Sequence, residues 1–189
     1  QVRESVTGPQ YDFILRTHSL DIFYGHPESQ LSFAEIDGGL GFQAGFQENV
    51  YRGLPLIPNY RSLGLSIFGT ERISFQDVDL EMGARLDHLS RNAFLDELSY
   101  ERHLRRESLQ KDQCQPDGGV FACPHTDTTG SFSLGTLVHL VPEKLDFKID
   151  LSNANRFPNI DELYLIGSAP SYPVYANGQP DLGVERTYS

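Results

Sequence analysis

The sequence contains no apolar run that approaches the ~18 residues of a transmembrane helix. This absence excludes a helical membrane protein, so a membrane protein of this composition would have to be a β-barrel. Hydrophobic residues make up 39% of the 189 residues, slightly less than in an average soluble domain. A barrel tolerates that low share, because each of its strands needs apolar side chains on only one face.

Basic residues are scarce. The chain has 15 Lys and Arg against 26 Asp and Glu, which gives a formal net charge of −11. Nucleic-acid binding requires clustered basic side chains that neutralise phosphates, and we therefore expect no nucleic acid as a partner. The nearest approach to a basic cluster lies among acidic residues, namely Arg102, Arg105 and Arg106 beside Glu101, Glu107 and Asp112.

The short motifs of common enzyme classes are also missing. The sequence has no H-x-x-x-H pattern, no G-x-S-x-G nucleophile elbow and no phosphate-binding loop. Carboxylate pairs are frequent, but barrel strands supply them without any catalytic need. We therefore expect no enzymatic activity, and an outer-membrane phospholipase or protease barrel is the remaining enzyme alternative.

Only two cysteines are present, Cys114 and Cys123, and they flank a Pro-Asp-Gly-Gly turn in the segment CQPDGGVFAC. The turn brings the two ends of the segment together, which favours a disulfide-closed loop in an oxidising compartment. The alternative is a pair of free thiols in a cytosolic loop. A C-x-x-C metal or redox pair is absent.

The dominant pattern is an alternation of apolar and polar residues, which predicts strands with two different faces. It is clearest in Ala34–Phe46 and Gln76–His88. These stretches exceed the ~5–6 residues of an ordinary strand and match the ~9–11 residues of a tilted strand that crosses a bilayer. Weaker copies complete a set of six predicted strands, at Asp12–Tyr24, Tyr60–Arg72, Ser131–Val141 and Leu145–Asn153.

Short and long connections alternate strictly between these strands. The short ones are predicted at Gly25–Gln30, Thr70–Ser74 and Pro142–Lys144. The long ones, residues 50–59, 92–130 and 155–185, would lie outside the cell, as in barrels with short periplasmic turns and long extracellular loops. Within the longest connection, Leu95–Leu109 has helix-compatible spacing, although the flanking strands could instead extend beyond the membrane. The predicted fold class is thus all-β, with antiparallel up-and-down strands that form part of a large transmembrane β-barrel.

Two segments near the C-terminus resemble motifs of the TonB-dependent outer-membrane receptors. The segment NRFPNIDELY (155–164) resembles their R-x-P…E-L-Y motif, and GQPDLGVERTYS (178–189) resembles their G-N-P-x-L-x-x-E segment, with Gln179 in place of the usual Asn. LIPNY (56–60) and MGARLD (82–87) are similar to two further segments of the family. The four matching segments together span about two-thirds of the chain. The matching residues of the paired motifs are Arg156, Pro158, Glu162, Leu163, Tyr164, Gly178, Pro180, Leu182 and Glu185.

The resemblance implies a barrel of about 22 strands in the cell outer membrane, with a plug domain in its lumen. Through that plug, which residues 1–189 do not contain, the partner TonB would drive uptake of a scarce small nutrient. The nutrient would be a metal ion, haem or a ferric siderophore, with zinc as the favourite. Because the chain starts and ends in mid-pattern, we expect it to be an excerpt of a partial barrel within a longer protein.

Two groups of loop residues are candidates for ligand binding. Imidazole and carboxylate groups suit zinc, and His103, His125 and Asp127 supply them in one long loop. Phe157, Tyr164, Tyr172 and Tyr175 could stack on a siderophore or haem, or form the aromatic girdle at the membrane surface. Arg156 and Glu162 are expected to pair, with the alternative that both are solvated loop charges.

The lumen face of Gln76–His88 carries several charged side chains, which we interpret as an ordinary polar wall, with a cation path or a contact to the plug as the alternative. No resident cofactor is expected. The competing interpretation of the whole chain is a soluble all-β ligand-binding module, such as a carbohydrate-binding sandwich, whose long loops carry the site. Detergent separates the two, because only lipid-facing apolar strands would need it.

Overall fold

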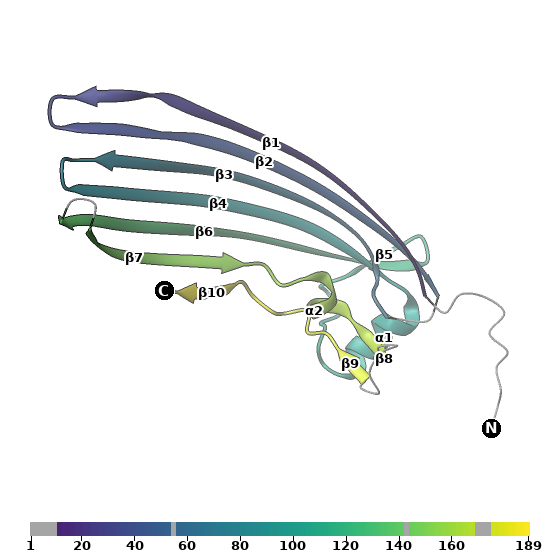
Figure 1. Cartoon of the computed structure of the whole chain (residues 1–189). Coiled ribbons are helices and arrows are strands. Elements are labelled where there is room, and N and C mark those ends of the chain that lie inside the picture. Colours follow the sequence, from purple (N-terminus) through teal and green to yellow (C-terminus); the bar gives the residue numbers. More distant parts are fainter. Residues whose placement is uncertain (1–10, 54–55, 142–143, 169–174) are drawn as a thin grey trace.

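The computed structural model describes residues 11–53, 56–141, 144–168 and 175–189. It is an all-β structure dominated by one antiparallel sheet (Figure 1). The long strands are β1 (Tyr11–Leu31), β2 (Ala34–Gly53), β3 (Asn59–Ser74), β4 (Val78–Leu95), β6 (Val120–Val141) and β7 (Leu145–Arg156). The short elements are α1 (Glu97–Arg105), β5 (Gln115–Asp117), α2 (Ile160–Tyr164), β8 (Ile166–Ser168), β9 (Tyr175–Asn177) and β10 (Glu185–Tyr188).

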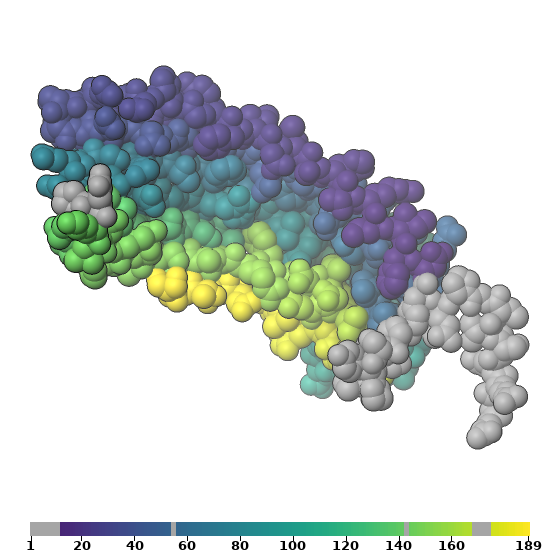
Figure 2. All heavy atoms as spheres, in the orientation of Figure 1, coloured from purple at the N-terminus to yellow at the C-terminus, as the bar shows by residue number. Residues whose placement is uncertain are grey.

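The sheet has the order β1-β2-β3-β4-β6-β7-β10, and each strand is antiparallel to the next. This up-and-down order confirms the six predicted strands. Within the described residues β1 and β10 do not pair with each other, so the sheet is open. In Figure 2 the first strand (purple) and the C-terminal strand (yellow) lie at opposite borders of the body.

The strands are longer than predicted, which corrects the position of two turns. The segment Gly25–Gln30 lies inside β1, with irregular pairing between His26 and Ser29, and the turn follows at residues 32–33. Pro27 fits there because an irregular pairing site on an outer strand needs no donor from it. The turn predicted at Thr70–Ser74 lies at residues 75–77.

The connection predicted at residues 92–130 is mostly structured. β4 continues to Leu95 and β6 already begins at Val120, so both strands extend well beyond the predicted boundaries. Between them α1 confirms the helix-compatible spacing; its N-cap residue Asp96 accepts the N–H of Ser99 at 2.8 Å. Neither helix in the described ranges is long and apolar enough to cross a membrane.

One face of the sheet is apolar and exposed. The pairing register aligns the apolar residues of neighbouring strands, for example Phe42 with Ile67 and Ile67 with Leu86. Leu40 keeps 68% of its surface exposed. We call these side chains the apolar band: Leu20, Ile22, Tyr24, Leu40, Phe42, Phe46, Leu63, Leu65, Ile67, Met82, Leu86, Phe132, Leu134, Phe147, Ile149 and Leu151.

The band covers a limited stretch of each strand. On β2 it is bounded by Gly38, which pairs with Glu71, and by Glu48. At about 3.3 Å per residue these limits are about 33 Å apart along the strand, which corresponds to a height of about 25 Å at the tilt of about 40° that is typical of barrel strands. From β2 to β7 the apolar stretch moves toward the hairpin turns, as is typical of a level band on tilted strands.

The opposite face, which we call the polar face, carries cross-strand polar networks. Arg85 on β4 donates to Asp87 at 2.7 Å, and to Gln43 on β2 and Ser66 on β3 at 2.8 Å each. Gln43 in turn donates to Asp21 on β1 at 2.6 Å. One chain of polar contacts therefore links four strands. This geometry agrees with the interpretation of an ordinary polar wall.

The hydrophobic core lies at the loop end of the polar face, remote from the turns at residues 32–33 and 75–77 (Figure 1). The polar face becomes apolar there, at Ala93, Leu95 and Cys123, and the connections fold over it. The ring of Tyr100 from α1 stacks on Phe121 with centroids 3.8 Å apart. The buried cluster, which we call the loop core, comprises Ala93, Leu95, Tyr100, Leu109, Cys114, Cys123, Leu163 and Tyr164.

The predicted disulfide between Cys114 and Cys123 is confirmed, and it lies in this core. Removing it should loosen the loop core and leave the strands of the apolar band in place. A cross-link that closes a loop of this length stabilises by about 2–3 kcal/mol. In the Cys114→Ser/Cys123→Ser variant we expect faster hydrogen exchange at the α1 amides and unchanged exchange at β2 and β3.

Wild-type chain that has been reduced and alkylated is the control for the serine substitutions. It should behave as the variant does if the cross-link itself is what matters. Equal exchange of α1 in oxidised and reduced chain would contradict a role of the disulfide in holding the loop core.

Candidate functional site

A groove lies on the polar face at the loop end, between β2–β4 and the segment that follows β7. Its volume is about 560 Å³. The sheet contributes polar and aromatic side chains, and residues 155–161 form the opposite wall. The lining residues are Gln47, Tyr60, Ser62, Arg85, Asp87, Leu89, Arg91, Asn155, Arg156, Phe157, Pro158, Asn159, Ile160 and Asp161.

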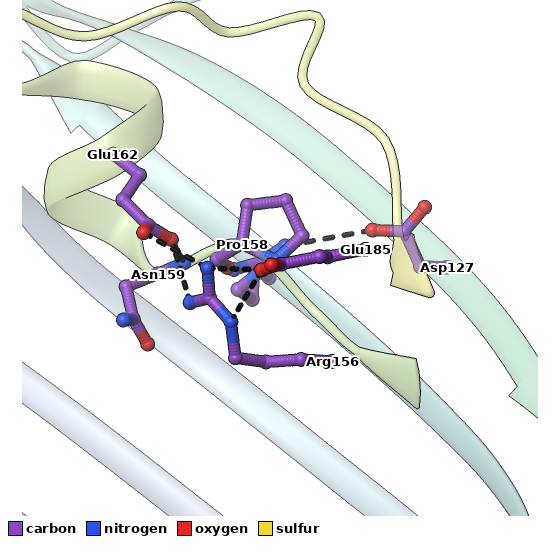
Figure 3. A network of polar contacts seen from close by, with 7 residues as sticks. Asp127, Arg156, Pro158, Asn159, Glu162 and Glu185 are labelled. Carbon is purple, nitrogen blue, oxygen red and sulfur yellow. Dashed lines mark hydrogen bonds and ion pairs between the residues drawn. The ribbon is translucent and has the colours of Figure 1, made fainter. Parts of the chain in front are cut away.

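Arg156 at the end of β7 is the main ionic centre of this wall. Its guanidinium donates to both carboxylate oxygens of Glu162 on α2, at 2.9 and 3.0 Å, and to Glu185 on β10, at 2.7 and 2.9 Å (Figure 3). The planar fork of arginine suits such bidentate contacts. The predicted pairing of Arg156 with Glu162 is therefore confirmed, and Glu185 is a second partner that the sequence did not indicate.

Glu162 also determines where α2 begins. Its carboxylate accepts the backbone N–H of Asn159 at 2.6 Å, in addition to the two bonds from Arg156. The guanidinium of Arg156, followed by this N–H, holds the pKa of Glu162 below its ordinary value of 4.5. The two carboxylates in turn raise the pKa of Arg156. Because all three ionised side chains are at least partly exposed, they mainly fix orientation.

Arg91 joins β4 to the same wall from beneath. It is only 6% exposed, and its Nη1 donates to the backbone carbonyl of Pro158. Its Nη2 lies 3.5 Å from a carboxylate oxygen of Asp127, and the same oxygen lies 2.6 Å from Nε2 of His125. Arg91 therefore anchors the segment at Pro158, while Asp127 compensates its buried charge.

The second motif segment packs directly on the first. A Cβ at Gly178 would lie 2.6 Å from the backbone of Leu163, so only glycine fits at this contact. The N–H of Gly178 donates to the carbonyl of Leu165 at 2.6 Å, and that of Gln179 to the carbonyl of Glu162 at 2.8 Å. The G-x-P segment is thus fixed on α2 by backbone contacts.

The remaining motif residues occupy mixed environments. Leu163 and Tyr164 belong to the loop core, and Pro158 and Pro180 are buried. Leu182 lies at the surface. The motif residues therefore serve to fold the segment over the polar face, and of them only Arg156 and Pro158 line the groove.

The predicted aromatic group is not assembled into one platform within the described residues. Tyr164 is buried, with the His103 ring edge-on at 6.1 Å, whereas Phe157 is half-buried in the groove wall. Tyr175 is exposed and lies beneath the guanidinium of Arg106, 4.8 Å from its ring centroid. Tyr172 lies outside the described residues. Of the three that the structure describes, Phe157 lines the groove and Tyr164 and Tyr175 do not.

The predicted metal ligands also lie in different environments. His103 on α1 is buried in contact with the loop core, with Nδ1 3.0 Å from the hydroxyl of Ser108, and burial lowers its pKa. His125 and Asp127 pair with each other on β6, beside Arg91. In the part of the chain that the structure describes, no three His, Cys, Asp or Glu residues form a group that could hold a metal ion.

Some groove residues were missed from the sequence. Leu89 and Arg91 lie on β4 past its predicted end at His88, whereas Tyr60 lies inside a predicted strand and was not assigned to a site. Their alternation with the apolar face along β3 and β4 was the available signal. Comparison with protein-family models and with curated proteins found no match to this chain. The relation to TonB-dependent receptors thus stays a resemblance. It is carried by motif segments of which the last two pack on each other, and the first of these forms one wall of the groove.

Replacing Arg156 by Lys should loosen this wall, because an ammonium group cannot bind both oxygens of Glu162 in a fork and hold Glu185 with two further bonds. We expect the amide of Gln179, which is bonded to the carbonyl of Glu162, to exchange several-fold faster. Arg105→Lys is the matched control, since Arg105 is an exposed arginine that binds Glu101 on its own helix. Equal exchange in the two variants would contradict the central role of Arg156.

The same contact should depend on pH. Because the pKa of Glu162 is lowered on folding, its stabilising effect is present above the ordinary value of 4.5 and is lost as the pH falls through the lowered value. Exchange at Gln179 should therefore accelerate below about pH 4 beyond the intrinsic trend. A Glu162→Gln variant should lack this step, and a step that persists in it would assign the effect to another group.

Proposed function

We propose that this chain is part of the wall of a transmembrane β-barrel in the cell outer membrane, and that it takes part in the uptake of a small nutrient. The observation that carries the proposal is the apolar band, a continuous exposed apolar surface on one face of six strands. A water-exposed surface of this size would be a liability in a soluble protein. Its height of about 25 Å matches the band expected of outer-membrane barrels.

The polar face supports the same orientation. Its charged and amide side chains are bonded across strands, as with Arg85, Gln43 and Asp21, and suit a water-filled or plugged interior. The groove at the loop end opens on this inner side. A ligand arriving from outside would therefore meet the groove walls before it met the narrower part of the lumen.

The receptor assignment rests on the motif residues and their geometry. The Arg156 centre folds residues 156–161 inward over the polar face, which places a wall where a ligand path would narrow. The groove offers arginine side chains together with the rings of Tyr60 and Phe157. This lining suits an organic ligand with acidic groups and planar parts, such as haem or a ferric siderophore. TonB would supply the energy through a plug domain, without covalent chemistry in this chain.

The lipid-facing orientation can be tested with introduced tryptophan, because the chain has none. Ile149→Trp and Lys148→Trp form a matched pair, because the two residues are neighbours on β7 and point to opposite faces. Ile149 is 52% exposed, and the side chain of Lys148 is about half exposed. In vesicles of phosphatidylcholine with dibrominated acyl chains, we expect strong quenching and a blue shift at position 149 and little of either at position 148.

Two results would overturn the proposal. One is equal quenching at both positions, which would mean that the sheet does not separate lipid from water. The other is a chain that stays monomeric in buffer without detergent and leaves both tryptophans unquenched. That second result would favour the soluble ligand-binding module.

A further inference from the structure

The border of the apolar band at its loop side carries an arginine pair that the proposed function does not use. Arg16 on β1 and Arg61 on β3 both pair in register with Glu48 on β2, on the face that carries the band. Each arginine binds one oxygen of this carboxylate, at 2.9 Å. Glu48 thus lies between the two guanidinium groups and binds one on each side.

Both arginines keep donors available toward the surrounding medium. Arg16 uses only Nη1, and Arg61 only Nε, in their bonds to Glu48. Their side chains are 57% and 63% exposed, whereas that of Glu48 is 20% exposed. The group carries one net positive charge on a chain whose net charge is −11. Its chemistry is that of an anion site, because arginine forks match phosphate oxygens in geometry.

The surroundings distinguish this anion site from one that faces only water. The next row of the same face toward the turns contains His18, Phe46 and Leu63, where the band begins. An anionic group bound at the arginines could therefore continue into acyl chains that lie on the band. The opposite border of the band on the same strands carries Glu71, which lies 3.0 Å from His26, and offers no arginine pair.

We infer that Arg16 and Arg61 form a binding site for the phosphate of a membrane lipid at the loop-side border of the apolar band. The phosphate takes the donors that the arginines do not give to Glu48, and the acyl chains cover Phe46 and Leu63. Glu48 acts as a positioning residue that keeps the two guanidinium groups apart and oriented. The inference rests on the proposal that the band faces lipid.

The test compares two lipids that differ only in the phosphate. The wild-type chain in a non-ionic detergent is titrated with dioleoyl phosphatidic acid or with dioleoyl glycerol, and bound lipid is counted by native mass spectrometry. We expect the phosphorylated lipid to bind at least several-fold more tightly. In Arg16→Gln/Arg61→Gln this preference should disappear, while binding of dioleoyl glycerol stays unchanged.

The matched control is Arg102→Gln/Arg105→Gln, which removes the same two charges from the last turn of α1. It should keep the preference for the phosphorylated lipid. If it loses the preference as well, the effect comes from net charge and the site is refuted. Thermal unfolding of each variant is measured in the same detergent, and an unchanged unfolding temperature shows that the sheet is intact.

Inorganic phosphate at millimolar concentration separates a lipid from a free anion as the occupant. Failure to displace phosphatidic acid supports the lipid site, and displacement at equal affinity overturns it in favour of a free phosphate site. Equal binding of both lipids by wild type and variant would refute the inference but leave the lipid-facing band intact. No binding of either lipid, with unquenched tryptophan at position 149, would instead refute the proposed function.

Discussion

The pairing register is the constraint on which the rest of this structure depends. Because side chains alternate along a strand, a slip of one residue would exchange the apolar band and the polar face. The register from Phe42 to Ile67 and from Ile67 to Leu86 keeps the two faces separate across the strands. The backbone groups between paired strands bond to their neighbours, which is the condition for placing such a sheet in lipid. Under the proposed function, lipid excludes water from the exposed band and so stabilises it.

The same register also determines how the loop core forms at the loop end of the sheet. Beyond the band, the inward side of β4 and β6 changes from charged residues to Ala93, Leu95 and Cys123. Those small and apolar side chains allow α1 and α2 to cover the polar face and build the loop core. Arg156 and Arg91 then fix the covering segment at Glu162 and at Pro158, respectively. The sheet therefore has two apolar surfaces on opposite faces, one covered by the chain itself and one left exposed.

The periodic part of this architecture could be predicted from the residues, and the irregular part could not. Alternation in Ala34–Phe46 and Gln76–His88 identified the strands and their faces, and the turn between the cysteines indicated the disulfide. The end of β3 was misplaced because the alternation of apolar and polar residues breaks at Glu71, which occupies a position of the apolar face, yet Thr70 and Glu71 still pair with Gly83 and Met82. The metal and aromatic groups depended on loop residues being close in space, which spacing alone does not determine. The fold puts His103 against Ser108 and Tyr164 in the loop core, whereas His125 pairs with Asp127 on β6.

Two glycines on the polar face of β2, Gly39 and Gly41, lie under aromatic rings of the neighbouring strands. A Cβ at Gly41 would overlap the ring of Phe68 from β3, and one at Gly39 would lie 2.7 Å from the ring of Phe23 on β1. The two rings lie nearly parallel, with centroids 6.3 Å apart, and the guanidinium of Arg85 lies 5.5 Å from the centre of the Phe68 ring. Aromatic side chains of neighbouring strands thus cover Gly39 and Gly41 of β2 and replace the missing side-chain contacts there, whereas the space above Gly45 is open. The result is a surface on which the rings of Phe23 and Phe68 take the place of side chains on β2, and the Arg85 guanidinium lies over one of those rings.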